Sequence, residues 1–298
     1  MLFNTSKISI DLITNECLSK KDITLSVIRL DKIHPIISGN KLFKLHYYLE
    51  EVQKKQLAGV VTFGGAYSNH LVATAYACRD LNIKSVAFVR GEKPAKLSPT
   101  LLACIDFGME LIFIPRAEYN QKADDKFLEK VSAHWSKYLI VPEGGYSFKG
   151  AAGAALITNT LTTDYSHICT AVGTGTTLAG LLMGAKEKQK IIGVPVIKGK
   201  SDIGERLTFL TGKDFPCQLL EGYDFGGYAK KTPDLIHFMN SFYTNYKIPT
   251  DFVYTAKMMV AVLDKIEQNF FEQGSNIACL HTGGLQGNRS LPAGTLCF

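Results

Sequence analysis

Short runs of apolar residues alternate with helical patterns along most of this 298-residue chain. The clearest example is residues 59–63, which are followed by a helical pattern over residues 69–81. Strands that alternate with helices build parallel sheets with helices on both faces. No low-complexity linker separates two halves, and the length allows one or two domains. The alternation therefore predicts an α/β protein, and if there are two domains they are interwoven.

The same two patterns predict the remaining strands and helices. Apolar runs predict strands at residues 85–89, 110–114, 138–141, 167–172, 190–196 and 277–280. Helical patterns cover residues 99–107, 123–134, 177–188, 233–245 and 256–268. A further helix follows Lys41, because Leu45, Leu49 and Val52 recur on one side of it.

Composition excludes several classes of protein. With 46% hydrophobic and 20% charged residues, the chain is not disordered. The net charge is +6, but the Lys and Arg residues are scattered, so no nucleic-acid partner is expected. The mild positive charge is compatible with an anionic ligand. Seven Cys without a Cys-x-x-Cys pair indicate reduced thiols in the cytoplasm. The uncharged residues 168–185 are expected to form a strand, a turn and a helix, with no membrane partner.

Four loops that follow predicted strands are rich in Gly and small polar residues. They cover residues 64–70, 142–147, 173–177 and 281–284. Ligands in parallel sheets bind at the carboxyl ends of the strands. These loops are therefore the first places to look for a site.

The loop Gly173, Thr174, Gly175, Thr176 and Thr177 lies between a predicted strand and a predicted helix. Glycines let backbone N–H groups converge, and a helix N-terminus favours an anion. The loop lacks the third glycine of a dinucleotide fingerprint and the Gly-Lys of a P-loop, so a nucleotide is disfavoured. Taken alone, a phosphate cradle and a plain tight turn are equally good interpretations.

The other candidate site residues are weak evidence for function when each is taken alone. Lys41 and Lys44 share one side of a helix near its start, where solvated lysines are the simpler interpretation. Ser68 and Asn69 suit a helix cap as well as a ligand. His70 has no visible partner for acid–base work. Tyrosines such as Tyr228 and Tyr254 are most often core residues.

The order of these elements along the chain resembles one family. Gly39-Asn-Lys-Leu-Phe-Lys44, the Ser-Asn-His loop, the Gly-Thr-Gly-Thr-Thr loop and the His-Thr-Gly-Gly loop resemble pyridoxal-phosphate enzymes of the tryptophan-synthase-β type. The resemblance is to the branch that holds 1-aminocyclopropane-1-carboxylate deaminases and D-cysteine desulfhydrases. It runs from about residue 30 to residue 284. It implies the fold-type II architecture, with a large domain of residues 1–44 and 155–298 and a small domain of residues 45–154.

The resemblance also implies roles for individual residues. Lys41 matches the lysine that holds pyridoxal 5'-phosphate covalently, and burial together with a neighbouring cation such as Lys44 would lower its pKa. Lys44 and residues 173–177 match positions that bind the cofactor phosphate, and Asn69 matches the amide beside its phenolic oxygen. Thr282 matches the residue that faces the pyridine nitrogen.

Ser68, Tyr254 and Tyr228 match residues that handle the substrate, and Tyr228 matches least securely. In the family pattern, the deaminase has Glu after the ring-side tyrosine, Leu after the last-loop histidine, and Gln in place of His70. This chain has Thr255, Thr282 and His70. A hydroxyl facing the pyridine nitrogen leaves the cofactor a weaker electron sink, which suits β-elimination.

The resemblance therefore predicts a lyase that converts a small amino acid, D-cysteine in the first place, to pyruvate, sulfide and ammonia. The alternatives are ring opening of 1-aminocyclopropane-1-carboxylate to 2-oxobutyrate and ammonia, and a pyridoxal-phosphate-binding protein without catalysis. Family analogy also predicts a homodimer.

Overall fold

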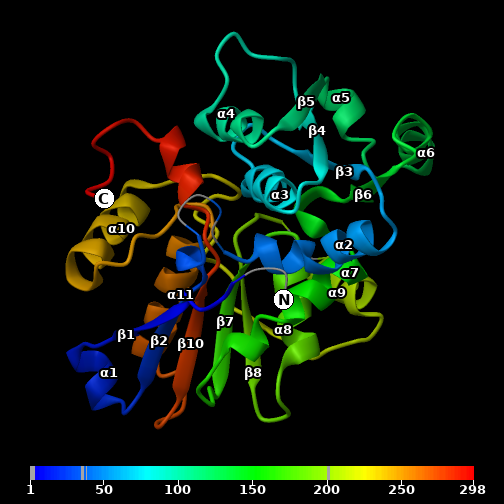
Figure 1. Ribbon diagram of the computed structural model, residues 1–298. Coiled ribbons are helices and arrows are strands. Elements are labelled where there is room, and N and C mark those ends of the chain that lie inside the picture. Colours follow the sequence, from blue (N-terminus) through cyan, green and yellow to red (C-terminus); the bar gives the residue numbers. More distant parts are fainter. Residues whose placement is uncertain (1–3, 35–36, 38, 200–201) are drawn as a thin grey trace.

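The computed structural model describes residues 4–34, 37, 39–199 and 202–298. Two separate sheets organise these residues, one in each half of the molecule (Figure 1). Helices surround both sheets, so the predicted α/β class is confirmed.

The larger sheet has six strands. Their order is β1 (Ser9–Ile13), β2 (Thr24–Arg29), β10 (Asn276–His281), β7 (His167–Val172), β8 (Lys190–Pro195) and β9 (Gln218–Leu219). β1 pairs with β2 antiparallel, and the other neighbours are parallel. The central strand β7 is buried at every position, which is why it reads as a continuous apolar run.

The smaller sheet has four parallel strands. Their order is β5 (Met109–Ile114), β4 (Lys84–Arg90), β3 (Gly59–Gly64) and β6 (Tyr138–Val141). The aromatic rings of Phe63, Phe88 and Phe127 pack together on one side of it. Every strand of this sheet overlaps a run that the sequence predicted.

Helices connect and cover the strands. Those before and within the smaller unit are α1 (Glu16–Lys20), α2 (Lys41–Lys54), α3 (Asn69–Asp80), α4 (Pro99–Asp106), α5 (Arg116–Tyr119) and α6 (Asp125–His134). Those that follow are α7 (Phe148–Ala155), α8 (Thr176–Gly184), α9 (Ile203–Thr211), α10 (Pro233–Tyr246) and α11 (Thr255–Glu267). Short 3₁₀ turns cover Leu30–Lys32, Glu143–Gly145, Thr158–Thr160 and Leu285–Ser290.

Helix starts follow ordinary capping chemistry. The hydroxyl oxygens of Ser68, Ser98, Ser147 and Thr232 each accept a hydrogen bond from a backbone N–H in the first turn of the helix that follows. The apolar side of α2 is buried at Leu45, Leu49 and Val52, as its spacing predicted.

Small residues let α2, α7 and α8 pack closely between the two sheets (Figure 1). A Cβ atom on Gly153 would lie 2.2 Å from the Phe43 carbonyl oxygen, and one on Gly180 would lie 2.5 Å from the Ala154 Cβ. Gly184 is equally tight against the Thr158 hydroxyl, at 2.6 Å. The Gly-x-x-x-Gly spacing thus serves helix packing inside the fold. Within the described ranges, no helix has the length and apolar character that crossing a bilayer requires.

Two details differ from or extend the sequence reading. The helix predicted over residues 177–188 ends at Gly184, because the backbone of Ala185 is extended. The predicted domain boundaries at residues 44/45 and 154/155 both fall inside helices, α2 and α7. The division into those two domains therefore stays a prediction.

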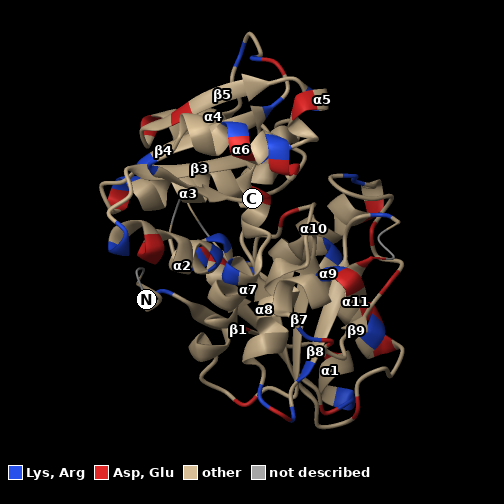
Figure 2. Cartoon of the chain, turned by 90° about the vertical axis from the view of Figure 1, so that its right-hand side faces the viewer, with Lys and Arg blue, Asp and Glu red and all other residues tan. Residues whose placement is uncertain are grey.

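Charged residues are interspersed on the face shown in Figure 2, with blue and red patches in both halves of the molecule. This agrees with the scattered Lys and Arg of the sequence. All seven cysteines are free thiols, four of them buried.

Candidate active site

The four loops predicted from the sequence follow strands of both sheets. Residues 64–70 follow β3 and residues 142–147 follow β6, whereas residues 173–177 follow β7 and residues 281–284 follow β10. The parallel pairing brings the carboxyl ends of each set of strands to one edge of its sheet. Contacts among these loops and the start of α2 build one site.

Asn40 ties the start of α2 to two of the loops. Its side-chain amide donates a hydrogen bond to the Thr177 hydroxyl at 2.6 Å, and its backbone N–H donates to the Thr282 carbonyl at 3.3 Å. The Lys41 ammonium donates to the Asn40 side-chain oxygen at 2.9 Å. Lys41, Thr177 and Thr282 are therefore held around one buried amide.

Gly39 is required by the approach of two backbones. Its φ is +91°, and a Cβ atom there would lie 1.9 Å from the Thr282 carbonyl oxygen. A side chain would clash and would also strain the backbone. This close approach fixes where α2 begins relative to the end of β10.

The two lysines of α2 lie in surroundings that disfavour positive charge. Burial lowers the pKa of Lys41 to about 8, although Asp251 acts in the opposite direction. Burial, and then repulsion by Lys41, lowers the pKa of Lys44 well below its usual value. The sequence predicted that burial and a neighbouring cation such as Lys44 would both lower the pKa of Lys41; burial does so, whereas Lys44 is not among the causes of this shift. The interpretation of both as solvated lysines is wrong for Lys44, which is 4% exposed.

The loop after β6 covers Lys44. A Cβ on Gly145 would lie 3.2 Å from the Lys44 Cβ, and one on Gly144 would lie 3.6 Å from a Thr174 methyl carbon. Both glycines have positive φ, at 72° and 67°. The glycine turn thus lies between the lysine and the loop after β7, and it excludes water from the lysine stem.

The loop after β7 leads into the N-terminus of α8. Gly175 has φ +92° and no side chain caps the helix, so its first N–H groups are left for another acceptor. The Thr174 and Thr176 hydroxyls lie 3.0 Å apart beside this turn. Converging N–H and O–H donors near a buried lysine suit a phosphate group better than a plain turn.

The loop after β3 contributes polar atoms that lack partners. Ser68 caps α3, where its Oγ accepts from the Leu71 N–H at 3.3 Å and keeps its own hydrogen to donate. Asn69 Oδ1 is buried, and among the described residues it has no hydrogen-bond partner. A Cβ on Gly284 would lie 3.3 Å from Asn69 Nδ2, which places the amide beside the loop after β10.

His70 is buried next to Asn69. Its Nε2 lies 2.8 Å from the Thr62 hydroxyl, which donates its hydrogen to the Val141 carbonyl. Nε2 is therefore assigned the hydrogen, and Nδ1 is a buried acceptor without a partner in the described part of the chain. Burial, followed by Lys41 and Lys44, lowers the pKa of His70 to about 3.

The two predicted tyrosines come together on one side of the site. The rings of Tyr228 and Tyr254 meet edge to face with centroids 6.2 Å apart. A Cβ on Gly173 would lie 3.1 Å from the Tyr254 ring, so this ring borders the loop after β7. Burial and then Tyr228 raise the pKa of Tyr254 well above 10. Tyr228 is 52% exposed and is not a core residue.

Sequence reasoning missed Asp251, which is fully buried beside the site. Its carboxylate accepts hydrogen bonds from the N–H groups of Val253, Tyr254 and Thr255 and from the Thr255 hydroxyl. A Cβ on Gly284 would lie 3.0 Å from its Cγ. An Asp shortly before a predicted helix is typical of an Asx turn, but only the fold shows that Asp251 also acts on Lys41.

Tyr119 and Glu143 were also missed. The Tyr119 hydroxyl is buried without a hydrogen-bond partner among the described residues. Burial, Glu143 and, more weakly, Tyr228 raise its pKa. Glu143 also contributes to raising the pKa of Tyr254. Electrostatic effects thus link these side chains of the smaller unit to Tyr228 and Tyr254 of the larger one.

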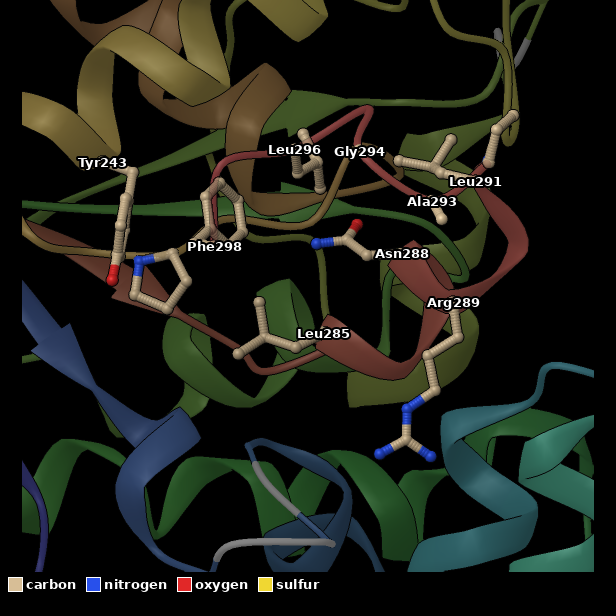
Figure 3. A pocket seen from close by; sticks show the side chains of 11 residues that line it. Tyr243, Leu285, Asn288, Arg289, Leu291, Ala293, Gly294, Leu296 and Phe298 are labelled. Carbon is tan, nitrogen blue, oxygen red and sulfur yellow. The ribbon is translucent and has the colours of Figure 1, made fainter.

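A separate pocket of about 530 Å³ lies at the C-terminal segment (Figure 3). Tyr243, Leu285, Asn288 and residues of the last ten positions line it. It contains none of the predicted site residues, so the contacts described above, and not this pocket, define the candidate site. The described residues hold no group of three side chains that could bind a metal ion.

The residues present fit pyridoxal 5'-phosphate. A lysine of lowered pKa offers an amine to an aldehyde, and the start of α8 with Lys44 offers donors and charge to a phosphate. Unpartnered Asn69 Oδ1 supplies a polar atom for the ring substituents, and Thr282 supplies a hydroxyl at the end of β10.

Comparisons with known proteins identify the family of the chain. Residues 12–283 match the family described as "Pyridoxal-phosphate dependent enzyme". A putative 1-aminocyclopropane-1-carboxylate deaminase of Thermotoga maritima is 31% identical over 90% of this chain and 91% of that protein. The bifunctional D-cysteine desulfhydrase/1-aminocyclopropane-1-carboxylate deaminase of Arabidopsis thaliana, a mitochondrial protein, is 26% identical over 84% of this chain and 70% of its own.

Solved structures show the same fold. A crystal structure described as an ACC deaminase homologue matches with a TM-score of 0.81 and 25% identity, covering 97% of this chain and 92% of that one. An aspartate racemase dependent on pyridoxal 5'-phosphate matches in fold alone, with a TM-score of 0.69 and 14% identity over 93% and 90% of the two chains. The chain therefore belongs to the fold-type II pyridoxal-phosphate-dependent enzymes, in the branch of 1-aminocyclopropane-1-carboxylate deaminases and D-cysteine desulfhydrases.

Proposed function

We propose that this enzyme is a lyase that eliminates the β-substituent of a small amino acid, with D-cysteine as its substrate. One water is consumed, and the products are pyruvate, hydrogen sulfide and ammonia. The Cα–H and Cβ–S bonds break, the electron pair of the latter leaves with sulfur, and the amino group is released by hydrolysis. Pyridoxal phosphate, when bound, draws electrons from Cα and so makes its hydrogen acidic.

The observation that carries the proposal is that position 255 holds a buried threonine whose hydroxyl is bound to Asp251. The deaminase pattern has a carboxylate directly after the ring-side tyrosine, and this chain has a fully buried threonine. The Thr255 hydroxyl is bound to Asp251 at 2.7 Å and accepts from the Asp251 N–H at 2.8 Å. It is therefore committed to Asp251, and no carboxylate at position 255 is available for ring opening.

The residues of the chain divide the remaining work. We assign Lys41 to hold the cofactor and to take the Cα hydrogen, because its lowered pKa gives it a neutral amine near pH 8. Lys44 and residues 173–177 would bind the phosphate, and Asn69 and Thr282 would orient the ring. Ser68 retains a hydroxyl hydrogen to donate, so it serves as the second candidate for proton transfer.

Tyr254 and Tyr228 would face the departing group. Because burial raises the pKa of Tyr254, its hydroxyl keeps its hydrogen and can donate a hydrogen bond to the departing sulfur. The proposal extends to a cytoplasmic enzyme, which the free cysteines support, and to a homodimer, which the family resemblance supports. Light scattering that gives the mass of a single chain would exclude the dimer.

A substrate screen tests the proposal. The purified protein, loaded with pyridoxal phosphate, is supplied separately with D-cysteine, L-cysteine, D-serine, 3-chloro-D-alanine and 1-aminocyclopropane-1-carboxylate. Sulfide, pyruvate and 2-oxobutyrate are measured. We expect equal amounts of sulfide and pyruvate from D-cysteine, and none from the Lys41→Ala variant.

Two outcomes would overturn the proposal. If 2-oxobutyrate forms from the cyclopropane substrate while D-cysteine is not consumed, the enzyme is the ring-opening deaminase. If no amine alters the visible spectrum of the bound cofactor, the protein binds the cofactor without catalysis.

A further inference from the structure

Lys257 is a buried cation that the proposed reaction does not use. It lies in the first turn of α11, and its side chain is fully buried. Burial lowers its pKa to about 8, against the opposite effects of Asp224 and Asp251. An ammonium is unfavourable both in a buried position and at a helix N-terminus. Its retention there calls for specific partners.

Those partners are two carbonyl groups of one loop. The Lys257 ammonium donates to the Asp224 carbonyl at 2.7 Å and to the Gly227 carbonyl at 2.7 Å. Both acceptors belong to the connection between β9 and α10. One side chain from α11 therefore binds this loop at two points, three residues apart.

The bound loop has a strained backbone. Phe225 and Ala229 have φ values of +51° and +53°, a region that residues with a side chain rarely adopt. Gly226 and Gly227 have φ values of +90° and +116°. A segment with this conformation persists only where its surroundings hold it. The bonds from Lys257 come from outside the segment and hold Asp224, which directly precedes it, and Gly227, which lies in its middle.

The loop carries Tyr228 between Gly227 and Ala229. Since Tyr228 is 52% exposed, packing alone does not fix its ring. The ring nevertheless lies edge to face against Tyr254, with an interplanar angle of 68°. Tyr254 directly precedes α11 and lies three residues before Lys257. The same end of α11 thus presents one tyrosine and the cation that binds the loop of the other.

We propose that Lys257 is a positioning residue, which holds Tyr228 against Tyr254 by binding the carbonyl groups of Asp224 and Gly227. The proposal rests on the proposed function, in which both tyrosines face the substrate. Lys257 itself touches neither substrate nor cofactor in this assignment. Its effect on turnover passes through Tyr228.

The test compares Lys257→Met, which keeps an unbranched side chain of similar length, with Lys265→Met as a control. Lys265 lies on the same helix, and its ammonium donates to the Gln268 side chain near the surface. Hydrogen exchange is measured by mass spectrometry on the full chain loaded with pyridoxal phosphate. We expect exchange over residues 224–230 to be at least ~tenfold faster in Lys257→Met, with α11 unchanged, and to be unaffected in the control.

A double-mutant cycle tests whether the effect passes through Tyr228. On the substrate that the screen identifies, Lys257→Met should lower kcat ~tenfold in the otherwise native enzyme, and less than ~twofold in a Tyr228→Phe background. Equal losses in both backgrounds, or unchanged exchange over residues 224–230, would overturn the proposal. If Lys257→Met does not fold, Lys257→Gln retains one donor and takes its place in both measurements.

The two arms keep this proposal separate from the proposed function. The exchange measurement does not depend on turnover, so an enzyme that ignores D-cysteine can still show the loop released by Lys257→Met. Turnover of D-cysteine without any coupling between Lys257 and Tyr228 would leave the function standing and remove the positioning role.

Discussion

The reactivity of Lys41 in the cofactor-free protein offers a quantitative test of the site. Its pKa of about 8, against an ordinary value of 10.5, leaves ~10% of the amine neutral at pH 7, compared with ~0.03% for a free lysine side chain. Only the neutral amine attacks an electrophile. Lys41 should therefore react ~300-fold more often than an unperturbed amine of equal accessibility.

Asp251→Asn is the informative perturbation. The Asp251 carboxylate raises the pKa of Lys41, so its removal should move that pKa below about 8 and increase the neutral fraction at pH 7 beyond ~10%. The matched control is Thr255→Val, which removes the two hydrogen bonds between Thr255 and Asp251 but keeps the negative charge. The control separates the effect of the Asp251 charge from the effect of its hydrogen bonds with the Thr255 hydroxyl.

Competitive labelling measures the effect. Trace acetic anhydride is added to cofactor-free protein between pH 6 and pH 10, with a free lysine derivative as internal reference, and acetylation of Lys41 is quantified by peptide mass spectrometry. We expect a midpoint near pH 8 for the native chain and for Thr255→Val, and a lower one for Asp251→Asn. A native midpoint near 10.5, or a midpoint that rises in Asp251→Asn, would refute the reasoning.

Three further predictions concern stability and cofactor binding. Gly39→Ala should lower the free energy of unfolding by at least ~3 kcal/mol, through backbone strain and the clash with the end of β10. Gly91→Ala is the control: Gly91 has φ +99° but open space around it, so the substitution should cost only ~1 kcal/mol. Equal losses in denaturant titrations would contradict the packing argument. Lys44→Met should stabilise the cofactor-free protein at pH 7, because a buried lysine whose folded-state pKa is lowered costs stability; the cost is full below the folded-state pKa and disappears as pH rises to about 10.5, the unfolded-state value. The same variant should bind pyridoxal phosphate at least ~tenfold more weakly, and unchanged affinity would remove Lys44 from the phosphate site. Between pH 6.5 and pH 3, His70→Gln should lose less stability than the native chain, by ~3–5 kcal/mol in equilibrium unfolding. The reason is that His70 takes up a proton near pH 6.5 in the unfolded state but only near its pKa of about 3 in the folded state. Identical acid profiles would show that His70 is not held neutral.

Much of the fold was predictable because its signals are local. The run at residues 59–63 became β3 since every position there is buried, and Ser68 marked the start of α3 through its own hydroxyl. The sequence placed the end of α8 at residue 188, whereas the helix ends at Gly184 and the backbone of the next residue is extended. The polar stretch after it still looks helical in sequence.

Some residues of the candidate site could likewise be predicted from the sequence, and others could not. Strand-end loops identified residues 68–70, 173–177 and 282 as neighbours, and the structure brings them together around the start of α2. The burial of Lys44 could not be inferred, because the glycine turn that covers it is about 100 residues away along the chain. Asp251 and Lys257 were missed for the same reason: Lys41 and Gly284, near which Asp251 lies, and the loop that Lys257 binds are distant along the chain.

Covalent attachment of the cofactor at Lys41 is the central claim and can be measured directly. The protein is loaded with pyridoxal phosphate, reduced with borohydride and digested, and the site of the added mass is read by tandem mass spectrometry. We predict one reduced pyridoxyl-phosphate adduct, on Lys41. An adduct on Lys44 or Lys257 instead, or no adduct on a protein that has turned yellow, would contradict the account.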